Sequence, residues 1–147
     1  MKSKTIVIVE DNPQDEALIL RILRKNHLAN EIDVVRDGQQ ALDYLFREGE
    51  FAQRPDALPA VVLLDINLPR INGIEVLSRL RAHPKTKSIP IVMLTSSDEE
   101  CDRVSSYQNG ANSFVRKPVD FAEFTKAVTN IGVYWLVTNE PPFFESS

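Results

Sequence analysis

Short apolar runs alternate with segments of helical periodicity along the whole chain. Five runs have the length and the β-branched content of strands, namely residues 5–9, 32–35, 60–66, 89–95 and 113–117. Most of them are apolar at consecutive positions rather than at every second position. This pattern is typical of parallel strands that helices cover on both faces.

The segments between these runs carry the spacing and the boundary signals of helices. We expect a helix that begins at Pro13, and further helices over about 38–47, 72–82, 98–108 and 120–137. The first has clear start signals, since Asn12 can cap it and the acidic Asp15 and Glu16 suit its first turn. The alternation of strand and helix predicts an α/β fold with an open parallel sheet and helices on both faces.

The last predicted helix is more apolar than one buried stripe requires. Helical spacing assigns a first group to the face that packs on the sheet: Phe121, Phe124, Val128, Ile131 and Trp135. A second group is left outside the core, namely Val133, Tyr134, Val137 and the tail residues Phe143 and Phe144. Because exposed apolar patches mark interaction surfaces, we expect a two-fold symmetric homodimer on the fifth strand and fifth helix, with Val133, Tyr134 and Val137 in its interface. The alternative is that the tail folds back and covers its own helix.

Composition narrows the possible classes of protein. A length of 147 residues fits a single domain, with a core over about 4–138 and a loose tail at 139–147. The net charge of −4 gives no basic footprint for nucleic acid or for an anionic membrane. Cys101 is the only cysteine, and no run approaches the ~20 apolar residues of a membrane helix, so we expect a cytoplasmic protein.

Charged side chains stand where the predicted strands end. Glu10 and Asp11 follow the first strand, Asp65 ends the third, and Lys117 ends the fifth. Ligands of open α/β sheets bind beyond these carboxyl ends. The three carboxylates and the one ammonium together give these strand ends a net charge of −2, which a divalent cation would neutralise. All-oxygen ligands suit Mg²⁺.

The same strand ends provide the groups that phosphoryl transfer requires. A carboxylate that contacts the metal with one oxygen can attack with the other, so Asp65 could accept a phosphoryl group. Thr95, at the end of the fourth strand, and Lys117 could then contact the equatorial oxygens.

Four motifs in this order resemble the receiver domain of two-component response regulators over about residues 4–130: "VEDN", "LLDINLPRINGIEVL", "LTSS" and "SFVRKP". The resemblance implies a flavodoxin-like sheet of order 2-1-3-4-5 and a phosphoacceptor at Asp65. It implies that Mg²⁺, or Mn²⁺, is held by a set of four residues: Glu10, Asp11, Asp65 and, through its backbone carbonyl, Asn67. It also implies phosphoryl contacts from Thr95 and Lys117, a switch aromatic at Phe114 and a cis peptide bond before Pro118.

Within this family, a long polar connection ("REGEFAQRPDALP") and the ending "YWLVTNEPP" are similar to small regulators paired with bacterial phytochromes. This narrower resemblance implies a sensor histidine kinase as partner and no attached output domain. The output would then be a face made by the fourth helix, fifth strand and fifth helix. The protein would act as a phosphoacceptor with slow autodephosphorylation rather than as an enzyme.

Three other functions fit the fold to some degree. A docking adaptor would keep the fold without phosphorylation, although the set of Asp65, Thr95 and Lys117 is then unexplained. A phosphatase with a strand-end aspartate would need a second acid two residues later, where this chain has Asn67. A flavodoxin-like electron carrier would need a phosphate-binding loop after the first strand, and "EDNPQDE" would repel a flavin phosphate.

Overall fold

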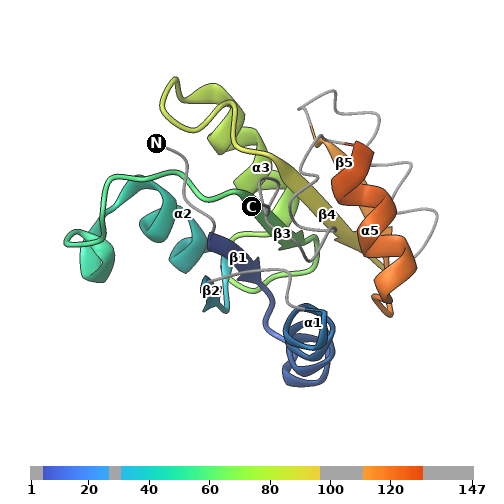
Figure 1. Cartoon of the computed structure of the whole chain (residues 1–147). Coiled ribbons are helices and arrows are strands. Elements are labelled where there is room, and N and C mark those ends of the chain that lie inside the picture. The colour runs from blue at the N-terminus through green and yellow to red at the C-terminus, as the bar shows by residue number, and fades with distance from the viewer. Residues whose placement is uncertain (1–4, 27–30, 97–110, 131–147) are drawn as a thin grey trace, which may run out of the picture.

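Five parallel strands form the centre of the molecule. The computed structural model describes residues 5–26, 31–96 and 111–130 (Figure 1). The strands are β1 (Thr5–Val9), β2 (Glu31–Val35), β3 (Val61–Asp65), β4 (Ile91–Thr95) and β5 (Ser113–Arg116). They are arranged in the order β2-β1-β3-β4-β5, so the predicted parallel sheet and its strand order are confirmed. This order makes β1 and β3 neighbours.

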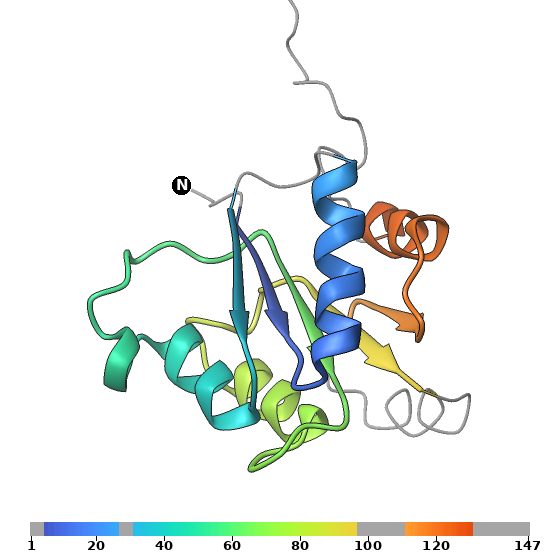
Figure 2. The same ribbon diagram turned by 90° about the horizontal axis from the view of Figure 1, so that it is seen from below.

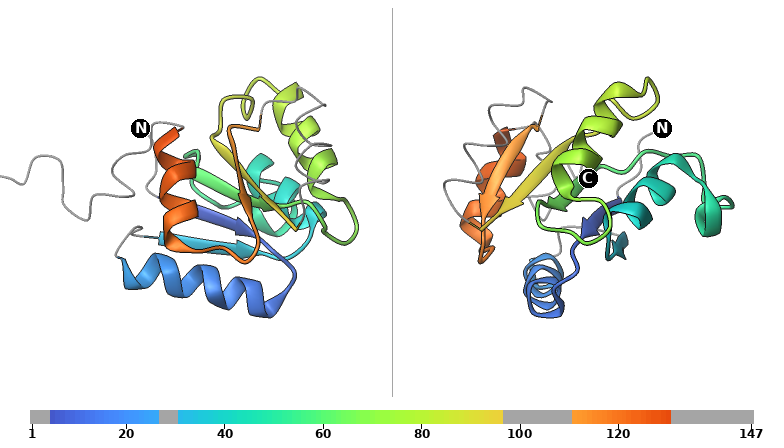
Figure 3. Two further views of the ribbon diagram at one scale, coloured as in Figure 1. Left: turned by 90° about the vertical axis from the view of Figure 1, so that its right-hand side faces the viewer. Right: turned by 180° about the vertical axis from the view of Figure 1, so that it is seen from behind.

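Helices cover both faces of the sheet. They are α1 (Pro13–Lys25), α2 (Gly38–Phe46), α3 (Gly73–Ala82) and α5 (Phe121–Asn130). Figure 2 shows α1 and α5 on one face, with α2 and α3 on the other, and the left view of Figure 3 agrees. No helix in the described ranges is long and apolar enough to span a membrane.

Consecutive strand residues face opposite layers, which explains their uninterrupted apolar runs. In β1, Ile6 and Ile8 pack toward α1 and α5, whereas Val7 and Val9 pack toward α2 and α3. All residues of β1, β3 and β4 are buried. Charged side chains can therefore reach water only at the ends of these strands.

The start of α1 follows the expected capping pattern. The side-chain Oδ1 of Asn12 accepts hydrogen bonds from the backbone N–H groups of Gln14, at 2.8 Å, and Asp15, at 3.1 Å. This cap fixes the first turn of α1 directly after the end of β1. The first turn is thereby held beside the carboxyl edge of the sheet.

The polar connection between α2 and β3 folds onto α2. It contains a short 3₁₀ turn, η1 (Gly49–Phe51). The guanidinium of Arg54 stacks 4.0 Å from the centre of the Tyr44 ring, and its Nε donates to the Tyr44 carbonyl at 3.0 Å. The Tyr44 hydroxyl donates to Asp33 on β2. These contacts give the connection a defined structure.

The prediction that Phe121 packs on the sheet is wrong. Phe121 is 41% exposed, whereas Phe124 and Val128 of α5 are buried. Phe121 begins α5 just after the end of β5, where the sheet stops and offers no surface to cover the ring. Other predictions concern segments outside the described residues. They are the helix over 98–108, the core residues Ile131 and Trp135, the interface residues Val133, Tyr134 and Val137, and the tail residues Phe143 and Phe144.

Candidate functional site: a pocket of carboxylates and a lysine at the strand ends

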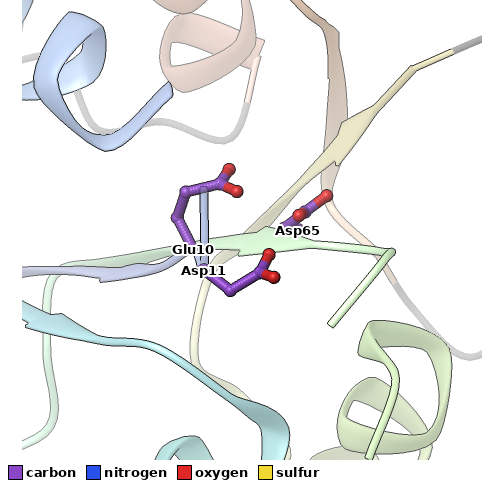
Figure 4. A group of neighbouring side chains, drawn as sticks. All are labelled: Glu10, Asp11 and Asp65. Carbon is purple, nitrogen blue, oxygen red and sulfur yellow. The ribbon is translucent and has the colours of Figure 1, made fainter. Parts of the chain in front are cut away.

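Three carboxylates gather at the carboxyl ends of β1 and β3. Glu10 and Asp11 follow β1, and Asp65 is the last residue of β3. Each offers an oxygen, and these oxygens lie within 4.8 Å of one another. Figure 4 shows the three side chains close together at the two neighbouring strand ends. The structure thus brings together the three acidic residues expected to bind a metal.

Two of these carboxylates are removed from water. The Glu10 residue is 0% exposed and Asp65 is 2% exposed, whereas Asp11 is exposed. Burial, together with the charge of Asp65, raises the pKa of Glu10 to about 7, although Lys117 acts in the opposite direction. Burial also raises the pKa of Asp65 against the influence of Lys117. The fold therefore confines negative charge that a bound cation would stabilise.

Lys117 supplies positive charge from the end of β5. Its Nζ lies 3.0 Å from Glu10 Oε1, 3.1 Å from Asp15 Oδ2 and 3.2 Å from Asp65 Oδ2. Burial alone would lower the Lys117 pKa, but the hydrogen bond to Glu10 and the charge of Asp65 raise it above its usual value. The side chain is therefore an ammonium at neutral pH.

The Lys117 backbone connects this residue to the neighbouring strand. Its N–H donates to the carbonyl of Thr95 at 2.7 Å, which joins the ends of β4 and β5. The peptide bond between Lys117 and Pro118 is cis, the geometry that the resemblance implies.

Asp15 belongs to the same pocket, although sequence reasoning assigned it only to the start of a helix. The Cα–Cβ bonds of a helix tilt toward its N-terminus, so side chains of the first turn project back past the helix start. For α1 this direction leads to the strand ends. The sequence did contain a signal for this position, because Asp15 lies in the first turn of a helix that begins shortly after the end of β1.

The pocket has a volume of about 460 Å³, and Asn67 and Ser96 line it together with the charged residues. Thr95 is 2% exposed and does not line the pocket, whose wall at the end of β4 is formed by Ser96. The backbone N–H of Asn67 donates to Asp65 Oδ1 at 3.3 Å. The roles expected for Thr95 and for the Asn67 carbonyl remain predictions.

Phe114 lies on β5, away from the pocket. Its half-buried side chain packs against the core beneath α2 and α3. The structure does not bring Phe114 into the group of charged side chains. Its expected role as a switch remains a prediction.

The loop after β3 packs closely behind Asp65. A Cβ atom placed on Gly73 would lie 2.1 Å from the Asp65 carbonyl oxygen. The Gly73 N–H donates to the carbonyl of Ile66 at 2.8 Å. Only glycine allows the start of α3 to approach the strand this closely. Sequence reasoning missed this residue, which supports the backbone of the candidate phosphoacceptor.

The donor set of the pocket is suited to a hard divalent cation. Glu10, Asp11 and Asp65 offer only oxygen atoms, which Mg²⁺ and Mn²⁺ prefer over nitrogen or sulfur donors. Burial and the charge of Asp65 raise the pKa of Glu10, and a cation held there would favour the ionised carboxylate. The residues present therefore fit a divalent metal ion.

Comparison with known protein families gives a match over most of the chain. Residues 6–129 match the model of the response regulator receiver domain. The chain is 39% identical to the probable methanogenesis regulatory protein FilR2 of Methanothrix harundinacea over 93% of this chain and 86% of FilR2. It is 36% identical to the response regulator Rcp1 of Synechocystis over 92% of this chain and 90% of Rcp1.

Solved structures show the same fold. The bacteriophytochrome response regulator RtBRR is 52% identical with a TM-score of 0.88, covering 96% of this chain and 85% of RtBRR. The phosphorylated cyanobacterial phytochrome response regulator RcpA is 38% identical, with a TM-score of 0.75 and coverage of 92% and 96%. Rcp1, solved with Mn²⁺ bound, has a TM-score of 0.74 at 36% identity and the same coverage.

Proposed function

The chain belongs to the response regulator receiver domain family, and on this premise we propose that Asp65 accepts a phosphoryl group from a sensor histidine kinase in a Mg²⁺-dependent reaction. The observation that carries this assignment is the environment of Asp65. One of its oxygens faces the Lys117 ammonium, and the side chain lies among the carboxylates that can bind a cation.

The residues of the pocket suit the transfer step. A carboxylate oxygen of Asp65 attacks the phosphorus of a phosphohistidine, the P–N bond breaks, and the electron pair leaves with the imidazole, so that an acyl phosphate forms. Glu10, Asp11 and Asp65 would hold Mg²⁺, which would neutralise their charge and stabilise the negative charge of the phosphoryl group during transfer. Lys117 offers its ammonium to the phosphoryl oxygens, and the Asn67 N–H holds Asp65 in position.

The pocket favours accepting a phosphoryl group over rapid hydrolysis. A phosphatase that forms an aspartyl phosphate would use a general acid two residues after the nucleophile. That position is Asn67, which cannot donate a proton in this way. We therefore infer a signalling protein whose aspartyl phosphate hydrolyses slowly. It would act in the cytoplasm, where ATP provides the phosphoryl group for the kinase.

The proposed partner is a phytochrome-type histidine kinase. The support is the similarity to RtBRR, RcpA and Rcp1, of which RtBRR and RcpA are described as phytochrome response regulators. FilR2 is similarly close in sequence and is described as a regulator of methanogenesis, so the kinase has to be identified by experiment. Thr95 and Phe114 would carry the phosphorylation signal to a face that includes β5 and α5.

Phosphotransfer from a radiolabelled histidine kinase tests the proposal. We expect label on the parent chain and on Asp56→Asn, an exposed control aspartate, but not on Asp65→Asn. Excess EDTA should abolish labelling, because the carboxylates alone repel the incoming phosphoryl group. Label on Asp65→Asn, or equal label with EDTA, would refute the assignment. A folded parent that takes no label from any donor would favour the docking adaptor.

A further inference from the structure

Carboxylate oxygens surround the Lys117 ammonium in the unphosphorylated pocket. The ammonium carries three N–H donors. Three carboxylate oxygens, from Glu10, Asp15 and Asp65, lie at 3.0, 3.1 and 3.2 Å from Nζ. When Asp65 is phosphorylated, its carboxylate becomes part of the acyl phosphate, so Glu10 and Asp15 are the carboxylates that compete with the phosphoryl group for Lys117.

These two carboxylates differ in how readily they can release Lys117. The side chain of Glu10 is 0% exposed, whereas that of Asp15 is 28% exposed. A buried carboxylate that loses its partner pays a large desolvation penalty, but a partly exposed one regains water. Asp15 is therefore the partner that Lys117 can leave at the lowest cost.

Asp15 is also distinct from the metal-binding group. Among the described residues, the carboxylates whose oxygens lie within 4.8 Å of one another are Glu10, Asp11 and Asp65, without Asp15. It comes from α1 rather than from a strand end, and within the pocket it forms an ion pair with Lys117. Its contribution to the pocket is therefore the position of the ammonium.

We propose that Asp15 is a positioning residue that holds Lys117 in the unphosphorylated state and competes with the phosphoryl group for it. The inference rests on the proposed function of Asp65. The phosphoryl group of an aspartyl phosphate carries close to two negative charges in place of the single charge of the Asp65 carboxylate, and these charges repel Asp15 while attracting the ammonium. Lys117 then exchanges its ion pair with Asp15 for a contact with a phosphoryl oxygen. Asp15 thereby lowers the affinity of the pocket for a phosphoryl group.

Binding of beryllofluoride, a stable mimic of the phosphoryl group, tests this competition. For each variant the Mg²⁺ concentration is first raised to saturation, because a lost carboxylate also weakens cation binding. We expect Asp15→Asn to bind beryllofluoride about five-fold more tightly than the parent, the effect of removing one nearby unit charge in a well-hydrated setting. Asp15→Glu should restore the affinity of the parent, since it keeps the charge.

Glu16→Gln is the matched control. It removes one negative charge from the same turn of α1, but Glu16 is paired with Arg36 at 3.0 Å rather than with Lys117. We expect its beryllofluoride affinity to equal that of the parent. An Asp15→Asn variant that binds no more tightly than the parent, or a Glu16→Gln variant that tightens equally, would overturn the inference.

The failure of this inference can be told apart from failure of the proposed function. If the parent does not bind beryllofluoride with Mg²⁺, or if Asp65→Asn binds it equally well, the assignment of Asp65 is wrong. If the parent binds and requires Asp65, an unchanged affinity of Asp15→Asn overturns only the role of Asp15. Urea unfolding of each variant shows whether it is folded under the conditions of the binding measurement.

Discussion

Replacing Glu10 with glutamine should stabilise the metal-free protein at pH 8, although the change removes a residue of the candidate metal site. Glu10 is fully buried, and its pKa is raised from 4.5 to about 7. Between these values the folded state retains a proton that the unfolded state has lost. The stability associated with this proton is fully present below pH 4.5 and is lost as the pH rises through about 7.

The size of the expected stabilisation follows from the difference between the pKa values of Glu10 in the unfolded and folded states. At about 1.4 kcal/mol per pH unit, ionising Glu10 in the folded state costs about 3 kcal/mol at pH 8. The attraction of Lys117 is already included in this value. Glutamine keeps the size of the side chain and can accept the hydrogen bond that the Asn12 N–H donates to Glu10 at 3.2 Å. We therefore expect a gain of about 1–3 kcal/mol in the free energy of unfolding.

Urea unfolding followed by circular dichroism, with EDTA present, measures this gain. The gain of Glu10→Gln over the parent should be present at pH 8 and close to zero near pH 4.5. Glu50→Gln, at an exposed position, should change stability little at either pH. Adding Mg²⁺ should stabilise the parent more than Glu10→Gln, because the cation binds the ionised carboxylate. A variant that is less stable than the parent at pH 8, or a gain that does not change with pH, would refute the reasoning.

Three further predictions concern the support of Asp65, the switch and self-association. Gly73→Ala should destabilise the protein by about 1–3 kcal/mol or more and slow labelling of Asp65, because its Cβ would lie 2.1 Å from the Asp65 carbonyl oxygen; unchanged thermal unfolding would contradict this. Thr95→Ala should retain phosphorylation but lose the response of a fluorine NMR probe near Phe114 to beryllofluoride, and a response equal to that of the parent would exclude Thr95 as the relay. In sedimentation equilibrium the parent should form a dimer that Tyr134→Glu weakens, whereas a parent that stays at 16.6 kDa, with or without phosphorylation, would exclude the dimer.

The sequence alone was sufficient to predict those features that depend on residues close to one another in the chain. The strands could be predicted because residues such as those of 61–64 are apolar on both faces, as a covered parallel sheet requires. The start of α1 could be predicted because Asn12 caps N–H groups two and three residues further along the chain. The positions of Glu10, Asp11 and Asp65 at strand ends followed from the same apolar runs, and with them the outline of the site.

Other features depended on which elements become neighbours. The sequence indicates Asp15 only as a residue of a helix start, and only the tertiary fold brings it to Lys117, about one hundred residues later in the chain. Phe121 has helical spacing suited to the core, yet the sheet ends before it can be covered. The crowding of Gly73 against Asp65 likewise arises from tertiary packing. Hydrophobic periodicity and helix capping involve residues that are close in the chain, so the sequence determines them. Burial and ion pairing depend on distances between residues far apart in the chain, and only the tertiary structure sets these distances.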